Sequence, residues 1–154
     1  MVYGSPYSAE ASNSACHFAN AVFKKGHRIN SIFFMHDGAL NASATVRNPQ
    51  GKSNNQASLK AGQATNDSPG PQTHQSTCGH TFPHQWQRIR AQYNTELLVC
   101  IGSALRQGVI NEAERERHTA PCATLADGFE LSGLGTLFES VIRSDRVITF
   151  GAAP

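Results

Sequence analysis

The chain has 154 residues, of which 39% are hydrophobic and 16% charged, and its formal net charge at pH 7 is +2. This length favours a single domain, and so small a charge is unlike the basic footprint of a dedicated nucleic-acid-binding protein. No uncharged apolar run approaches the roughly 20 residues that cross a bilayer, and residues 1–6 lack the basic and apolar regions of a secretory signal.

The four cysteines are spread along the chain and form no Cys-x-x-Cys pair; they are Cys16, Cys78, Cys100 and Cys122. Their number is far below the density of disulfide-stabilised secreted domains. We therefore expect a cytoplasmic protein with reduced thiols, which contacts neither membranes nor nucleic acids directly.

The first part of the chain predicts a helix and then a buried strand. A helix over 8–25 would begin with Ser8 as its N-cap and end before Gly26, a residue type that suits the position after a helix. One face of this helix carries four apolar residues at helical spacing, Ala11, Ala15, Phe18 and Val22. The apolar run 29–35 follows as a strand and is closed by His36-Asp37-Gly38.

A polar segment over 48–85 interrupts this pattern. It holds only six apolar residues and four of the seven prolines of the chain. Such a composition buries too little apolar surface to offset the entropy that is lost when the chain is ordered. We expect one domain over 1–154 with a flexible insertion at about 48–85, which is dispensable for folding.

Helical and strand signals alternate again after this segment. A helix over 83–93 has Trp86, Ile89 and Tyr93 on one face, and the apolar run 97–101 predicts a short strand. Further helices are expected over 103–107, 112–118 and 134–143, and a last strand over 146–150.

Helices that alternate with apolar strands are typical of βαβ units, in which helices cover both faces of a mostly parallel sheet. The sequence therefore predicts an α/β fold. The first strand is the weakest element, because only residues 1–3 precede Gly4. Either this strand is nearly absent, or the true start of the protein lies upstream of Met1.

Cys100 is the best-placed reactive residue. It lies near the end of the strand 97–101 and precedes Gly102-Ser103 and a helix, and this edge of the strands is where open α/β sheets bind ligands. The positive end of a helix favours the thiolate and can lower a cysteine pKa from about 8.5 into roughly the 3.5–7.5 range. A thiolate is the nucleophile in disulfide and persulfide exchange. The alternative is a buried structural cysteine that acts as a small hydrophobic residue.

The remaining cysteines have less favourable surroundings. Cys16 lies beside the apolar stripe of the first helix and suits packing, and Cys122 follows Pro121 in a loop without an adjacent positive charge. Cys78 belongs to a cluster of potential zinc ligands, His74, Cys78, His80 and His84. Their spacing matches no established zinc pattern. We expect no metal and no cofactor, with a zinc-stabilised binding module as the alternative.

Six motifs occur in order: Gly4-Ser5-Pro6-Tyr7, Lys25-Gly26-His27, Phe33-Phe34-Met35-His36-Asp37-Gly38, Leu98-Val99-Cys100-Ile101-Gly102-Ser103-Ala104-Leu105-Arg106-Gln107-Gly108-Val109, Leu131-Ser132-Gly133-Leu134-Gly135 and Asp145-Arg146-Val147-Ile148-Thr149-Phe150. Together they resemble the DsrE/TusD sulfurtransferase family over nearly all of the chain except 48–85, where this chain is longer than the family pattern. The resemblance implies a DsrE-like three-layer sandwich with a mostly parallel sheet and helices on both faces.

The resemblance also implies a subunit of a sulfur relay. In that family, the cysteine that matches Cys100 accepts sulfane sulfur as a persulfide and passes it on without a cofactor or metal. TusD-type members take sulfur from a TusA-like donor and hand it to a TusE-like acceptor, for 2-thiolation of the tRNA wobble uridine. They work in a heterohexamer with TusB- and TusC-like subunits. DsrE-type members serve sulfur oxidation instead.

A non-catalytic scaffold subunit is a further alternative, which the presence of Cys100 disfavours. Five apolar residues exceed what a small core with a short first strand is expected to cover: Ile29, Ile32, Phe33, Phe34 and Phe138. Because uncovered apolar patches usually mark interfaces, we expect the protein to function in an assembly and not as a monomer.

Overall fold

The computed structural model describes residues 1–7, 10–45 and 82–151. Within these ranges the chain forms a three-stranded parallel sheet in the order β1-β2-β3. The strands are β1 (Ser31–Phe34), β2 (Glu96–Cys100) and β3 (Phe129–Ser132). The helices are α1 (Glu10–Lys24), the 3-10 helix η1 (His36–Ala42), α2 (Phe82–Tyr93), α3 (Ile101–Arg106), α4 (Glu112–His118) and α5 (Leu134–Ile142).

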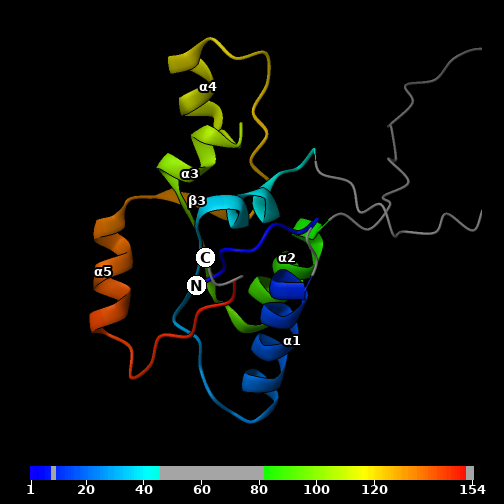
Figure 1. Ribbon diagram of the computed structural model, residues 1–154, viewed down its shortest axis with the longest axis vertical. Helices are drawn as coiled ribbons and strands as arrows, with labels where there is room; N and C mark the ends of the chain where they lie inside the picture. The colour runs from blue at the N-terminus through cyan, green and yellow to red at the C-terminus, as the bar shows by residue number, and fades with distance from the viewer. Residues whose placement is uncertain (8–9, 46–81, 152–154) are drawn as a thin grey trace, which may run out of the picture.

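Helices lie on both faces of the sheet. In Figure 1, α1 and α2 run side by side on one face, α5 lies on the other, and α3 and α4 extend beyond the end of the strands. This arrangement confirms the predicted α/β fold with a parallel sheet between two layers of helices. No helix in the described part of the chain is long and apolar enough to cross a bilayer.

Side chains of the strands alternate between two hydrophobic clusters, because successive strand residues point to opposite faces of a sheet. Phe34 and Val99 belong to the larger cluster, together with Trp86 of α2. Phe33 and Leu98 belong to the smaller one, with Cys100. Since both faces are covered, the strands read as continuous apolar runs, which is why β1 and β2 are recognisable in the sequence.

The buried face of α1 differs from the predicted stripe. Its buried residues are Ser12, Ala15, Cys16 and Ala19. Phe18 is 38% exposed and contacts Phe150 through its ring, with 5.4 Å between the centroids. Of the predicted stripe Ala15 is buried, Ala11 and Val22 are half-buried and Phe18 is exposed, so the prediction of this stripe was only partly correct. The predicted end of the helix is confirmed: Gly26 has a φ of +79°, and the His27 N–H donates to the Val22 carbonyl. The predicted N-cap, Ser8, lies outside the described residues.

The two predicted outer strands are reduced to single positions. Val2 donates its N–H to the Phe33 carbonyl at 2.8 Å and accepts from the Met35 N–H at 3.0 Å. It also forms a parallel bridge with Phe150, the only position of the predicted strand 146–150 that pairs in the described residues. Within the described ranges, the first strand is thus limited to Val2, and the expectation of a full last strand was wrong.

Two elements were not predicted from the sequence. One is β3 and the other is η1. In addition, α2 begins at Phe82, so residues 82–85 belong to a helix and not to the predicted insertion. The rest of that insertion, 48–81, lies outside the described residues.

A buried asparagine ties η1 to the rest of the fold. The Asn41 side-chain amide donates to the carbonyls of Gly4, at 3.2 Å, and Gly38, at 2.9 Å. Its side-chain oxygen accepts from the Trp86 indole at 3.3 Å and from the Ser12 hydroxyl. Because buried polar groups that are fully bonded rigidify their surroundings, η1 holds a defined position at the end of β1.

Candidate functional site

Cys100 lies where the sequence predicts it, at the C-terminal end of the middle strand. Val99 pairs with Phe34 of β1, and Cys100 pairs with Ser132 of β3. The following residue begins α3, so Cys100 is the N-cap residue of that helix. Cys100 therefore occupies the edge of the sheet at which open α/β folds bind their ligands.

Apolar side chains enclose most of Cys100. The residue is only 9% exposed and clusters with Phe33 and Leu98, against which Met35 and Leu137 also pack. An enclosed site keeps water from reactive intermediates and so prevents side reactions. The Cys100 side chain is therefore largely shielded from solvent.

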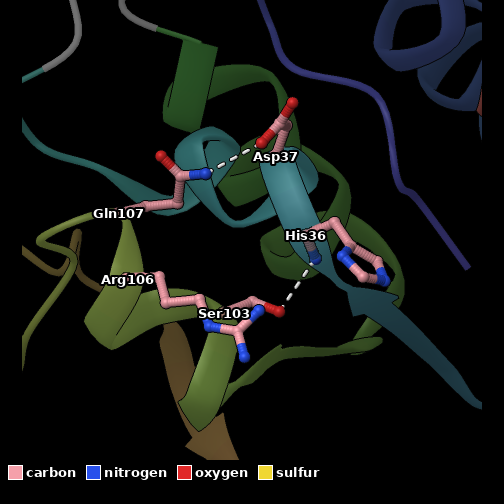
Figure 2. A pocket seen from close by; sticks show the side chains of 5 residues that line it. All are labelled: His36, Asp37, Ser103, Arg106 and Gln107. Carbon is pink, nitrogen blue, oxygen red and sulfur yellow. Dashed lines mark hydrogen bonds between the residues drawn. The ribbon is translucent and has the colours of Figure 1, made fainter.

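A pocket of about 250 Å³ opens beside this strand end (Figure 2). It is lined by His36, Asp37, Ser103, Arg106 and Gln107. One wall is η1, which begins two residues after β1, and the other is α3, which follows β2 directly. Ser103 lies three residues after Cys100, and residues three apart on a helix are neighbours. The pocket therefore begins within one helical turn of Cys100.

His36 has an uncommon backbone conformation at this pocket. Its φ of 49° lies in the left-handed region, which costs a residue other than glycine roughly 1–3 kcal/mol. The His36 N–H donates to the Ser103 hydroxyl at 2.9 Å, as Figure 2 shows, and the His36 ring stacks on Tyr3 with 5.3 Å between centroids. Backbone strain of this kind gathers at functional sites.

The two fully charged side chains of the pocket are not paired with each other. The Asp37 carboxylate accepts a hydrogen bond from the Gln107 side-chain amide at 2.8 Å. Within the described residues, Arg106 has neither an ion pair nor a side-chain hydrogen bond. Its guanidinium is exposed and available to a bound anion.

None of the five pocket residues was predicted as a site residue. His36 and Asp37 had been read only as the close of a strand, and Arg106 and Gln107 only as the end of a short helix. The available signal was topological: residues that follow neighbouring parallel strands meet at the same edge of the sheet.

The other two described cysteines lie elsewhere. Cys16 is buried in the larger cluster, on the opposite face of the sheet from Cys100. Burial raises the pKa of the Cys16 thiol, and the nearby Arg88 offsets this shift only in part. The prediction that Cys16 serves packing is confirmed. Cys122 is exposed in the connection between α4 and β3.

Most of the predicted cluster of potential zinc ligands lies outside the described residues, namely His74, Cys78 and His80. His84 is exposed on α2. Over residues 1–7, 10–45 and 82–151, no three His, Cys, Asp or Glu side chains gather closely enough to hold a metal ion.

Comparison with known proteins identifies the family to which the chain is similar. The model of the DsrE/DsrF-like family matches residues 1–69 and 71–150. "Sulfurtransferase TusD" from Serratia proteamaculans is 35% identical over 150 residues, covering 97% of this chain and 95% of the relative. "Putative sulfurtransferase DsrE" from Allochromatium vinosum is 30% identical over 146 residues, covering 95% and 92%.

A solved structure has the same fold. The crystal structure of the ychN protein from E. coli aligns with a TM-score of 0.59 and covers 97% of this chain and 95% of its own. The sequence identity is 18%, so this likeness bears on the fold alone.

Proposed function

Since this chain belongs to the DsrE/DsrF-like family and its relatives are named sulfurtransferases, we propose that it carries sulfur on Cys100 as a persulfide. The observation that carries this proposal is the position of Cys100. Of the three cysteines in the described residues, it is the one at the ligand-binding edge of the sheet.

The chemistry is two successive thiol exchanges. The Cys100 thiolate attacks the terminal sulfur of a donor persulfide, a new S–S bond forms at Cys100, and the donor leaves as its thiolate. An acceptor thiolate then attacks the outer sulfur of the Cys100 persulfide and releases the Cys100 thiolate.

We infer a role in a cytoplasmic relay for 2-thiolation of the tRNA wobble uridine, with a TusA-like donor and a TusE-like acceptor. Relatives named TusD, at 35% and 32% identity, favour this role over that of the relative named DsrE, at 30%. Sulfur oxidation is the second candidate. Neighbouring genes for TusB- and TusC-like proteins would support tRNA thiolation, and genes for sulfite reductase would support oxidation.

The test is to locate the transferred sulfur. The protein is incubated with a persulfide-loaded TusA-like donor, alkylated and digested, and the added sulfur mass is assigned by peptide mass spectrometry. We expect it on Cys100 and not on Cys16, because burial of the Cys16 thiol raises its pKa and leaves little thiolate at neutral pH. Sulfur on another cysteine with Cys100 unmodified would contradict the proposal.

We propose that partner subunits cover the outer face of α5. No residue of this helix is buried, and it carries exposed apolar side chains together with the segment that follows it: Leu134, Phe138, Val141, Ile142, Val147 and Ile148. Phe138 alone remains from the surface predicted for assembly. Ile32, Phe33 and Phe34 are buried in the chain's own core, and Ile29 packs half-buried against the larger cluster. Through Leu137, α5 also packs against the Cys100 cluster, so a partner there would adjoin the site.

A charge on this helix should therefore disrupt the assembly. Phe138 is 71% exposed, so Phe138→Glu should leave folding intact while placing a carboxylate in an apolar interface, which costs several kcal/mol. We expect co-expression with TusB- and TusC-like subunits to give a discrete complex for the wild type and free subunits for the variant, measured by sedimentation velocity. Thr136→Glu adds the same charge at an exposed polar position of α5 and serves as the matched control. Equal complex formation by both variants would place the interface elsewhere.

A further inference from the structure

The pocket beside Cys100 is small and polar. Its volume of about 250 Å³ is below the 300–1,000 Å³ typical of sites for drug-sized ligands. Its lining side chains offer charged groups, a hydroxyl and an amide. Such a pocket suits a compact polar species of a few heavy atoms.

The pocket lining carries one negative and one positive side chain, and only the negative one is engaged by a described neighbour. The Asp37 carboxylate is engaged by Gln107 and the Ser103 hydroxyl by the His36 N–H. Arg106 has no partner of either kind in the described part of the chain. A guanidinium presents a planar set of donors that matches oxyanions.

The pocket that contains Arg106 lies at the end of the strand that carries Cys100. Ser103 is three residues beyond Cys100 on α3, and Met35, which packs against the Cys100 cluster, directly precedes His36. The two walls of the pocket therefore flank the end of the strand that carries Cys100. An anion held by Arg106 would therefore lie at the end of the strand that carries Cys100.

We propose that this pocket is a subsite for a small sulfur oxyanion that bears a sulfane sulfur, with thiosulfate as the simplest example. The inference rests on the proposed function of Cys100 and names a second source of its sulfur. The Cys100 thiolate attacks the outer sulfur of thiosulfate, the S–S bond of thiosulfate breaks, and its electron pair leaves with sulfite. The products are the Cys100 persulfide and sulfite, so the step needs no further oxidant or reductant.

A pair of alkylating reagents tests the subsite without sulfur chemistry. Iodoacetate is an anion and iodoacetamide is its neutral counterpart, and the rate of each at Cys100 is followed by peptide mass spectrometry. We expect Arg106→Gln to lower the ratio of the iodoacetate rate to the iodoacetamide rate by about tenfold, the effect of losing one charge-assisted hydrogen bond. Sulfate should compete with iodoacetate in the wild type. Arg28→Gln removes an exposed arginine outside the pocket and should leave the ratio as it is.

A second arm measures sulfite release and the Cys100 persulfide after addition of thiosulfate. The proposal predicts both products with the wild type and a loss of about tenfold in their rate with Arg106→Gln. An alkylation ratio that is the same in wild type and Arg106→Gln overturns the subsite. Loading by the TusA-like persulfide donor without any loading by thiosulfate also overturns it and leaves the proposed function standing. Failure of both donors overturns the proposed function and this inference with it.

Discussion

Replacement of Cys100 by serine should abolish sulfur transfer from a persulfide-loaded donor to a TusE-like acceptor. A serine hydroxyl does not ionise near neutral pH and forms no S–S bond, so neither exchange step has a nucleophile. Removal of a nucleophile from a catalytic unit costs orders of magnitude in rate, and we expect a loss of at least about 10³-fold. Transfer of radioactive sulfur between the two partner proteins is the measurement.

Two further variants separate chemistry from folding. Serine places a hydroxyl among Phe33, Leu98 and Leu137, and an unpaired buried hydroxyl costs about 1–3 kcal/mol. Cys100→Ala avoids that cost and should be equally inactive with a native circular dichroism spectrum. Cys122→Ser changes an exposed cysteine and should retain full activity. A Cys100→Ala variant that still transfers sulfur would refute the persulfide role of this residue.

Replacement of Gly38 by alanine should strongly destabilise the fold. A Cβ at Gly38 would overlap the carbonyl group of Val2, the group that accepts the Met35 N–H. Since the overlapped atoms are backbone and not the end of a flexible side chain, either η1 or the N-terminal segment must shift. Overpacking of this kind costs about 3 kcal/mol, which corresponds to a decrease of roughly 6–12 °C in Tm for a chain of this size.

Thermal unfolding followed by circular dichroism checks this result. Gly135→Ala is the matched control, because a Cβ at Gly135 meets no atom within 4 Å and the residue lies inside α5. Alanine is favoured over glycine in a helix by about 1 kcal/mol, so the control should unfold at an equal or higher temperature. Equal Tm values for Gly38→Ala and the wild type would contradict the close approach of η1 and Val2.

The local sequence determined the element that carries Cys100. The run from Leu97 to Ile101 is continuously apolar, because β2 is the middle strand and is buried on both faces. The residues after Cys100 favour a helix, and α3 begins there. Such elements are readable because their patterns depend on burial of a single segment. The placement of Cys100 at the edge of a parallel sheet was therefore predictable.

Strands that form only by pairing with another segment of the chain were not predictable in the same way. The run 146–150 is rich in β-branched residues, yet only Phe150 pairs in the described residues, because its neighbour in the sheet is the single position Val2. Conversely, β3 has only four residues, Phe129–Ser132, and becomes a strand by pairing with β2 along its whole length. Strand pairing is a property of two segments, and neither segment alone contains it.

The position of Cys100 was predictable from one segment, whereas the residues around it come from several segments and were not. The position of Cys100 follows from the sequence of its own strand and of the helix after it. The pocket, by contrast, joins Asp37 to Gln107, which are 70 residues apart, and His36 to Ser103, which are 67 residues apart. Only the parallel alignment of β1 with β2 brings these residues to one edge of the sheet. The outward face of α5 is likewise a tertiary result, since its side chains are exposed because the described chain does not cover them. The sequence alone thus determined the place of Cys100 in its strand, and the packing of distant segments decided what surrounds it.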